Sequence, residues 1–355
     1  MTHIPDQAAL SLMPTYEVVI VGAGISGLMA GQTLQAHGID NYLIVDKATS
    51  VGGRFATRRM HHAVLDHGAQ FFTARDPVFA SIVNSWVNAS WVKPWTRDHK
   101  NHQRFIAMQG MNALAKQVSV HQPVHTDVHV TAITREDSYW LLTGMNHRTQ
   151  EAVQLKATCV LVTIPAPQAI ALFEIDRIAS LHRGDPKDNR YTLDEDTQRV
   201  LQNIEYEPCL ALLVVMKEAS DHVDRGYIDH PREPLQWIID NQRKGISSHP
   251  AMTLHAQGLW SRRYYEQSDA WIQHEMLEAM QPEVNLSGIL DVQVKRWKYA
   301  KATRLHQASF HARADEPSLV FAGDGFGGNP KVMSGKVETA VISGVNAAHF
   351  IVTNR

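Results

Sequence analysis

Three glycines near the start of the chain have the spacing of a loop that binds a dinucleotide. Gly22, Gly24 and Gly27 follow the β-branched run at 16–21 (YEVVIV), and a segment with helical spacing begins directly after them. The first glycine permits a tight turn, the second lets the backbone approach a pyrophosphate, and the third lets helix and strand pack closely. The N-terminus of that helix then directs free N–H groups at the phosphates. The pattern predicts a phosphate site that includes Ser26.

An acidic residue ends the second predicted strand. The run at 42–45 (YLIV) is followed by Asp46 and Lys47, so the order is strand, glycine turn, helix, strand and acid. Asp46 can accept hydrogen bonds from both hydroxyls of an adenosine ribose, which favours a ribose without a 2′-phosphate. Asp46 and Lys47 are therefore candidate cofactor residues. The fingerprint by itself is compatible with NAD and with FAD.

Two glycines and an arginine directly after the second strand favour FAD. Gly52, Gly53 and Arg54 end the sequence VGGR. In flavoprotein oxidases a GGR at this place holds the pyrophosphate, and Arg54 can supply charge-assisted hydrogen bonds to it. The structural alternative is a glycine turn that carries a surface arginine.

The C-terminal region also favours FAD. A predicted strand at 318–321 is followed by Gly323 and Asp324, and a long predicted helix begins near Lys336 and Val337. Asp324 can accept hydrogen bonds from ribityl hydroxyls or lie beside the flavin-side phosphate. The helix start can direct N–H groups at the pyrimidine edge of the flavin, which stabilises negative charge on the reduced ring. Because these motifs lie at opposite ends of the chain, we expect a substrate domain to interrupt the flavin domain.

The predicted fold class is α/β, with a Rossmann-like FAD-binding domain and a second, mixed-sheet substrate domain of the glutathione reductase and amine oxidase type. Strands are predicted at 65–72, 123–133, 139–143, 159–163, 209–216, 236–240 and 252–256, and helices near 111–114 and 270–280. We assign residues 15–75, 105–166 and 296–355 to a discontinuous FAD-binding domain, and residues 76–104 and 167–295 to the substrate domain.

Composition argues against several other classes of protein. The 355 residues include 34 Lys and Arg and 36 Asp and Glu, so a net charge of −2 gives no reason to expect nucleic acid or a membrane as partner. Cys159 and Cys209 form no CxxC pair, and no metal site is predicted. No lysine or arginine precedes Lys47, so we expect a cytoplasmic protein without a secretory signal. The oligomeric state is left open.

The motifs together resemble bacterial renalase-like flavoproteins, which are relatives of the monoamine oxidase superfamily. They are VGAGISGL, VGGRFATRR, LDHGAQFFTARD, MQGMNALAK, VTIPAPQ, TLHAQGLWSRRYYE, KRWKYA, FAGDGFGG and VETAVISG, spread over residues 15–350. The resemblance implies noncovalently bound FAD and an oxidase that takes hydride from 2- or 6-dihydro isomers of NAD(P)H. The implied products are NAD(P)+ and, from O2, hydrogen peroxide.

The resemblance also implies residues of a substrate site. His255 matches an active-site position of the renalase branch and can donate a hydrogen bond to a substrate carboxamide. Trp297 can pack beside the isoalloxazine, and Gln70 and Phe71 can line the flavin. A packed histidine, a core tryptophan and simple strand packing are the structural alternatives. Further candidates are Ala69 beside the flavin, Val130 as a backbone contact of adenine and, more weakly, Trp237, Asp240 and Asn241.

Two alternative functions remain open. A flavin-containing amine oxidase typically flanks the substrate amine with two aromatic rings, but the alignment places Lys336 where one of them belongs. An ammonium group at that position would repel a cationic substrate. Hydride transfer from a dihydronicotinamide leaves an aromatic pyridinium and requires no general base, so the renalase reading is favoured. The second alternative is an FAD-binding sensor without turnover, which the replacement of a usual glycine by Thr339 keeps open.

Overall fold

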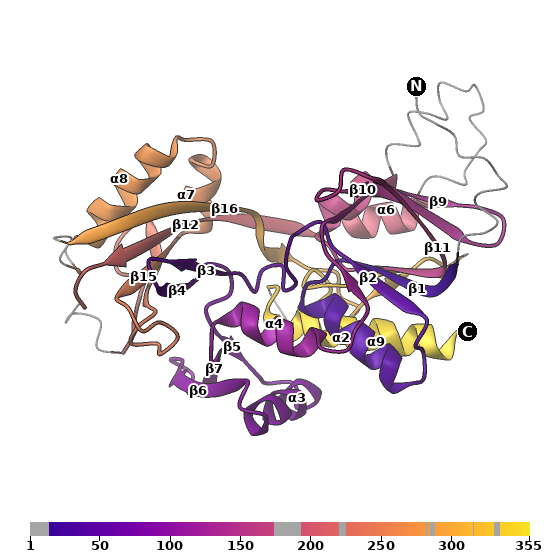
Figure 1. Cartoon of the computed structure of the whole chain (residues 1–355), viewed down its shortest axis with the longest axis horizontal. Coiled ribbons are helices and arrows are strands. Elements are labelled where there is room, and N and C mark those ends of the chain that lie inside the picture. Colours follow the sequence, from indigo (N-terminus) through magenta and orange to yellow (C-terminus); the bar gives the residue numbers. More distant parts are fainter. Residues whose placement is uncertain are drawn as a thin grey trace.

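The structure is a computed structural model that describes residues 14–173, 193–219, 225–281, 283–284, 288–314, 316–329 and 334–355. It has two lobes, and a pair of long strands runs from one to the other (Figure 1). Parts of the predicted substrate domain, including 174–192, lie outside the described residues. No helix in the described ranges is both long and apolar enough to cross a lipid bilayer.

The first lobe is built on an eight-stranded sheet. Its main path has the order β17-β18-β11-β1-β2-β8, and β9 and β10 extend it beside β11. The pairs from β18 to β8 are parallel, and β17, β9 and β10 pair antiparallel. The strands are β1 (Thr15–Val21), β2 (Tyr42–Val45), β8 (Val124–His125), β9 (Val128–Arg135), β10 (Trp140–Asn146), β11 (Ala152–Val162), β17 (His311–Ala312) and β18 (Leu319–Phe321).

The predicted strands and helices of this lobe are confirmed in type, except that the strand predicted at 123–133 is divided into β8, which pairs parallel with β2, and β9. Asp127 lies between the two with a φ of +62°, which interrupts the strand. The packing of these elements follows from burial. Residues 18–21 of β1 are buried on both faces, as expected of a central parallel strand. Three helices pack against one face of the sheet (Figure 1). They are α2 (Ile25–Ala36), α4 (Met111–Ser119) and α9 (Val337–Thr353), and α6 (Glu195–Gln202) lies on the other side of the sheet.

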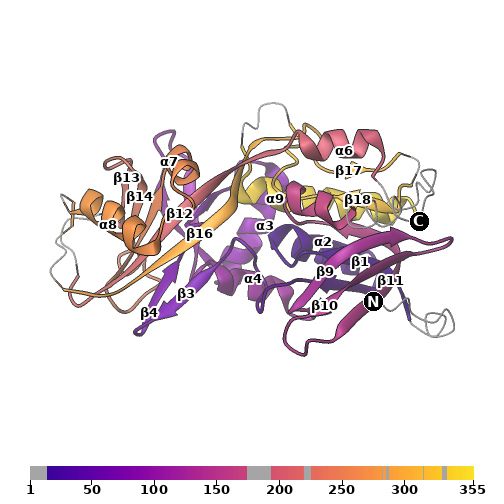
Figure 2. The ribbon, with the colours of Figure 1, turned by 90° about the horizontal axis from the view of Figure 1, so that it is seen from above.

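The second lobe is a five-stranded antiparallel sheet with the order β13-β14-β15-β12-β16. Its two longest strands pair from Glu205↔Arg304 to Met216↔Ile289 and extend back toward the first lobe, as Figure 2 shows from above. The helix α8 (Asp269–Met280) covers an apolar face of this sheet. The elements are β12 (Glu205–Met216), β13 (Tyr227–Asp229), β14 (Leu235–Asp240), β15 (Ala251–Ala256), β16 (Ile289–Arg304), α7 (Gly258–Arg263) and α8 (Asp269–Met280).

Two small sheets connect the lobes. The hairpin of β3 (Thr57–Met60) and β4 (Ala63–Asp66) packs against the second sheet through an apolar cluster. The other sheet has the order β5 (Phe72–Thr73), β7 (Gln103–Ala107) and β6 (Val92–Arg97), beside α3 (Pro77–Asn88). The predicted domain boundaries at 105 and 296 fall within β7 and β16, and the division into two domains remains a proposal.

The single strand predicted at 65–72 is wrong. β4 ends at Asp66 and β5 begins at Phe72, with an irregular segment between them. In that segment the N–H of Ala69 donates to the carbonyl of Arg54 at 3.0 Å, and the amide of Gln70 donates to the carbonyl of Asp66 at 2.7 Å. These bonds replace the strand ladder and bring the segment against the GGR loop.

Candidate active site

The glycine loop has the geometry that a pyrophosphate needs. Gly22 has a φ of +113°, and a Cβ on Gly27 would lie 2.0 Å from the carbonyl oxygen of Gly22. A Cβ on Gly24 would meet no atom within 4 Å. Gly24 is also the N-cap of α2, where no side chain caps the helix N–H groups. The close packing at Gly27 and the open approach at Gly24 match the roles predicted for these glycines.

Ser26 supplies an independent sign that a ligand belongs at this loop. It lies in the first turn of α2 and is 4% exposed, yet its hydroxyl oxygen has no hydrogen-bond partner among the described residues. A buried hydroxyl that makes no hydrogen bond is costly, so a bound acceptor would satisfy it. The residues present at the loop therefore fit a dinucleotide phosphate.

The N-terminal and C-terminal motifs meet at an ion pair. The two terminal nitrogens of Arg54 donate to the two carboxylate oxygens of Asp324, at 2.6 Å each. The N–H of Gly52 donates to the carbonyl of Ala23 at 2.8 Å, which joins the GGR loop to the phosphate loop. The structure thus commits Arg54 to Asp324, whereas the sequence predicted that each would bind the cofactor. Their contacts with a cofactor remain proposals.

Asp46 anchors the phosphate loop from the end of β2. Its carboxylate accepts hydrogen bonds from the N–H groups of Ala23 at 2.7 Å and Ala48 at 2.8 Å. Burial raises the pKa of Asp46, and these two bonds partly offset the rise. Lys47 beside it is exposed. The predicted contact of Asp46 with a ribose would use the acceptor sites that these bonds leave.

Most of the residues predicted for the cofactor and substrate sites line one cavity of about 730 Å³. It extends from the phosphate loop, past the ion pair of Arg54 and Asp324, to the second sheet. The predicted residues that line it are Gly24, Ser26, Arg54, Ala69, Gln70, Phe71, Trp237, His255, Trp297, Gly323, Asp324, Lys336 and Val337. The predicted residues outside its lining are Gly22, Gly27, Asp46, Lys47, Gly53, Val130, Asp240 and Asn241.

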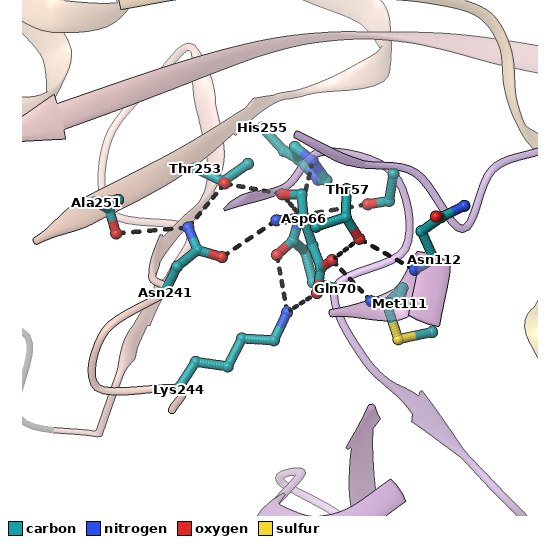
Figure 3. A network of polar contacts seen from close by, with 11 residues as sticks. Thr57, Asp66, Gln70, Met111, Asn112, Asn241, Lys244, Ala251, Thr253 and His255 are labelled. Atoms are coloured by element: carbon teal, nitrogen blue, oxygen red, sulfur yellow. Dashed lines mark hydrogen bonds and ion pairs between the residues drawn. The ribbon is translucent and has the colours of Figure 1, made fainter. Parts of the chain in front are cut away.

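Gln70 and His255 belong to a buried polar network, which Figure 3 shows from close by. The amide nitrogen of Gln70 lies 3.3 Å from Nε2 of His255, and its amide oxygen lies 3.3 Å from Nζ of Lys244. Lys244 also donates to Asp66 at 2.7 Å, and both side chains of that pair are fully buried. The hydroxyl of Thr253 donates to the Asp66 carbonyl at 2.8 Å. The network fixes the wall of the cavity.

His255 is neutral in this site. Burial lowers its pKa to about 4, even though a hydrogen bond to the backbone of His67 acts in the opposite direction. An amide nitrogen only donates, so Nε2 of His255 accepts from Gln70 and the ring proton lies on Nδ1. His255 therefore acts as an acceptor in the contact described, and its donation to a substrate remains a prediction.

Trp297 is held in place by its neighbour. Its indole N–H donates to the carbonyl of His67 at 2.8 Å, and the two rings stack with centroids 5.4 Å apart. Burial also lowers the pKa of His67 to about 4. The indole thus lines the cavity in one orientation, as a residue that packs against a flat ligand would.

We expect the two partly buried histidines, His67 and His255, to make the fold sensitive to acid. Their pKa values are near 4 in the folded chain and 6.5 as the ordinary value, so the unfolded chain binds more protons between those limits. Stability is therefore complete above about pH 6.5 and falls as the pH approaches 4. In urea unfolding over that window, H255Q should reduce the slope of free energy against pH by up to about 1.4 kcal/mol per unit. H274Q, which removes an exposed histidine of α8, should retain the full slope, and an equal slope in H255Q would contradict the assignment.

Three site residues were missed by the sequence analysis. Asp66 and Lys244 form the buried pair, and Arg104 of β7 lines the cavity while only 5% exposed. Asp66 lies within the LDHGAQ motif and could have been singled out there. Lys244 sits in a polar turn sequence and Arg104 in a strand-like one, where no local pattern distinguishes a buried cation from an exposed one.

Comparison with known proteins supports the nucleotide-binding part of the site. Residues 20–86 match the family model of an NAD(P)-binding Rossmann-like domain. A hydroxyneurosporene desaturase of Rubrivivax gelatinosus is 41% identical over 70 residues, and an L-glutamate oxidase precursor of Streptomyces diastatochromogenes is 38% identical over 80 residues. These matches cover 19% and 21% of this chain but only 13% and 12% of the relatives' own lengths.

Solved structures extend the likeness to the whole fold. A protein described as a protoporphyrinogen oxidase from Exiguobacterium sp. 255-15 superposes with a TM-score of 0.69 at 12% identity, over 97% of this chain and all of the other. Putrescine oxidase bound to putrescine gives 0.70 at 13% identity, over 96% of this chain and all of the other. The predicted fold class is confirmed: the chain contains a Rossmann-like nucleotide-binding domain within the fold of these oxidase structures.

Proposed function

We propose that this chain is an FAD-dependent oxidoreductase. The single observation that carries the proposal is the cavity shared by the phosphate loop, Arg54, Gly323 and the start of α9. FAD, when bound, supplies a two-electron acceptor that amino-acid side chains lack. The hydroxyl of Ser26 would donate a hydrogen bond to the pyrophosphate of FAD, and the open space at Gly24 would admit that pyrophosphate. The matched desaturase and L-glutamate oxidase, whose names denote oxidations, support this class of reaction.

The substrates that we propose are 2- or 6-dihydro isomers of NAD(P)H, with O2 as the electron acceptor and hydrogen peroxide as a product. Lys336 lines the cavity at the start of α9 and adds a positively charged side chain to it. A cationic wall favours a phosphorylated substrate over an ammonium one. The flat surfaces of Trp297, Phe71 and Trp237 suit a nicotinamide ring.

The cavity residues would orient the substrate and exclude water. Neutral His255 presents no charge to oppose the positive pyridinium that forms, and the network around Gln70 keeps it in position. Loss of hydride from a dihydronicotinamide restores aromaticity without removal of a proton. The site therefore needs orientation of the ring more than it needs a general base.

An amine oxidase is the second candidate. It is supported by the fold shared with putrescine oxidase and by polyamine oxidase 7 of Oryza sativa subsp. japonica, which is 35% identical over 71 residues. That match covers 20% of this chain and 15% of the relative. An FAD-binding sensor without turnover is the third candidate. Mixing the FAD-loaded protein with candidate substrates distinguishes the three proposed functions.

We expect anaerobic mixing of the FAD-loaded protein with a 2- or 6-dihydronicotinamide isomer to bleach the visible flavin absorbance within seconds. Admission of air should restore the absorbance and release hydrogen peroxide. Ordinary NADH serves as the control for isomer selectivity. Bleaching by putrescine, benzylamine or L-glutamate in place of the isomers would establish the amine oxidase alternative. Bound FAD that none of these compounds reduces would favour the sensor.

A further inference from the structure

Arg104 is a buried cation, and two of its three side-chain nitrogens have no hydrogen-bond partner in the described part of the chain. The side chain lines the cavity, and the residue is only 5% exposed. Its Nε and one terminal nitrogen, Nη1, are buried without a hydrogen-bond partner among the described residues. A guanidinium is charged at any physiological pH, so burial without hydrogen bonds is unfavourable. An unsatisfied cation that faces a cavity requires a functional explanation.

Three aromatic rings surround this guanidinium. Its central carbon lies 4.5 Å from the ring centroid of Phe71, 4.9 Å from that of Tyr227 and 5.2 Å from that of Trp237. Contacts of this kind stabilise a cation through the faces of the rings. They supply no hydrogen-bond acceptors for the N–H groups that lie in the guanidinium plane. The aromatic cage thus holds the charge and leaves Nε and Nη1 without an acceptor among the described residues.

The carboxylates that line the same cavity are paired with other side chains. Asp98 lies 3.0 Å from His102, Asp229 lies 2.6 Å from His230, and Glu207 lies 3.3 Å from Lys301. Asp324 is held by Arg54 in the two-point pair already described. In the described part of the chain, no carboxylate forms a salt bridge with Arg104. The charge of Arg104 is therefore not neutralised from within the site.

We propose that Arg104 binds an oxyanion of the substrate, a phosphate or a carboxylate. The planar fork of a guanidinium matches two oxygens of either group. The adjacent aromatic rings would then contact the apolar part of the same molecule. We infer the subsite from Arg104 and the three aromatic rings around it. The identity of the molecule that carries the oxyanion rests on the proposed function. A dinucleotide substrate brings a phosphate, and an amino acid brings a carboxylate.

The test measures binding without turnover. Nicotinamide mononucleotide and nicotinamide riboside differ by one phosphate, and L-leucine and isopentylamine differ by one carboxylate. Each is titrated into the FAD-loaded protein, and the change in the flavin spectrum gives Kd. In the wild type we expect the oxyanion to improve affinity in one of the two pairs, which identifies its source. R104M should weaken that ligand about 10- to 100-fold and leave its oxyanion-free counterpart unchanged.

Matched variants keep the result interpretable. R97M removes an exposed arginine from β6 in the same small sheet and should retain wild-type affinities. R104K keeps the charge but not the planar fork and should lose part of the preference. R104M should unfold at an unchanged or higher urea concentration, because it removes a buried charge that forms no salt bridge with any described residue.

Three outcomes would overturn the proposal. The first is a wild type in which neither the phosphate nor the carboxylate improves affinity. The second is an R104M protein whose affinity falls equally for both ligands of a pair. The third applies if R104M fails to fold, and it is an R104K protein that keeps the full preference for the ligand with the oxyanion. If only the dihydronicotinamide reaction fails, the oxyanion subsite can still be tested, because these titrations depend on bound FAD and not on substrate oxidation.

Discussion

Replacement of Gly24 by valine is expected to abolish FAD binding while the chain stays folded. Gly24 has a φ of −72°, which valine adopts without strain, and a Cβ at this position meets no protein atom within 4 Å. The space that the new side chain fills is the space through which a pyrophosphate must approach the helix N-terminus. We expect at least about a 100-fold rise in Kd, or about 2.7 kcal/mol. Titration of the protein with FAD, followed by fluorescence, measures it.

A second glycine provides the matched control. In G27A the new Cβ would lie 2.0 Å from the carbonyl oxygen of Gly22, so α2 and β1 would have to separate. This variant should lose both FAD binding and stability toward urea, whereas G24V should lose FAD binding alone. A yellow G24V protein with wild-type affinity would show that the pyrophosphate does not lie at this loop.

Replacement of Lys244 by methionine is expected to cost about 3–5 kcal/mol of stability, because it leaves the buried carboxylate of Asp66 without its cation. Both side chains of the pair are fully buried, 2.7 Å apart. Asp66 would keep its hydrogen bonds from the Thr57 hydroxyl at 2.6 Å and the Met111 N–H at 2.8 Å, which do not neutralise it. Urea unfolding of the purified variant measures the loss.

The control is the next residue along the chain. Arg243 lies 3.7 Å from Asp240 and is about one-third exposed, so water screens this longer pair and R243M should cost less than K244M. The double variant D66N/K244M should recover part of the loss, since neither partner then leaves a charge unpaired. A K244M protein as stable as R243M would show that the pair contributes little to the fold.

Local patterns predicted the nucleotide-binding part of the molecule. The strand, glycine turn and helix at 15–36 depend on contacts between near neighbours, such as that between Gly22 and Gly27. The meeting of the two chain ends was also predictable, because parallel strands place their carboxyl ends at one edge of a sheet. β18 pairs with β11 and β11 with β1, so the predicted motifs converge there.

The substrate side of the cavity was much less predictable. The chain between β4 and β5 departs from its strand pattern because the carbonyls of the loop at 54–56 and the side chain of Gln70, and not a neighbouring strand, satisfy its backbone. Lys244 and Asp66 are 178 residues apart in the sequence, and no periodic pattern of residues predicts that they form an ion pair. The ion pair of Arg54 with Asp324 likewise depends on the mutual position of two loops from opposite ends of the chain.

The sequence by itself determined the class of fold and the position of the glycine loop that we propose as the phosphate site. Strand burial and glycine spacing act over a few residues, so the linear order of the chain carries that information. Only the tertiary structure decided which cations are neutralised and which face the cavity with unused donors, as Arg104 does. The free energy of a buried charge depends on every group around it, and those groups come together only when the chain is folded.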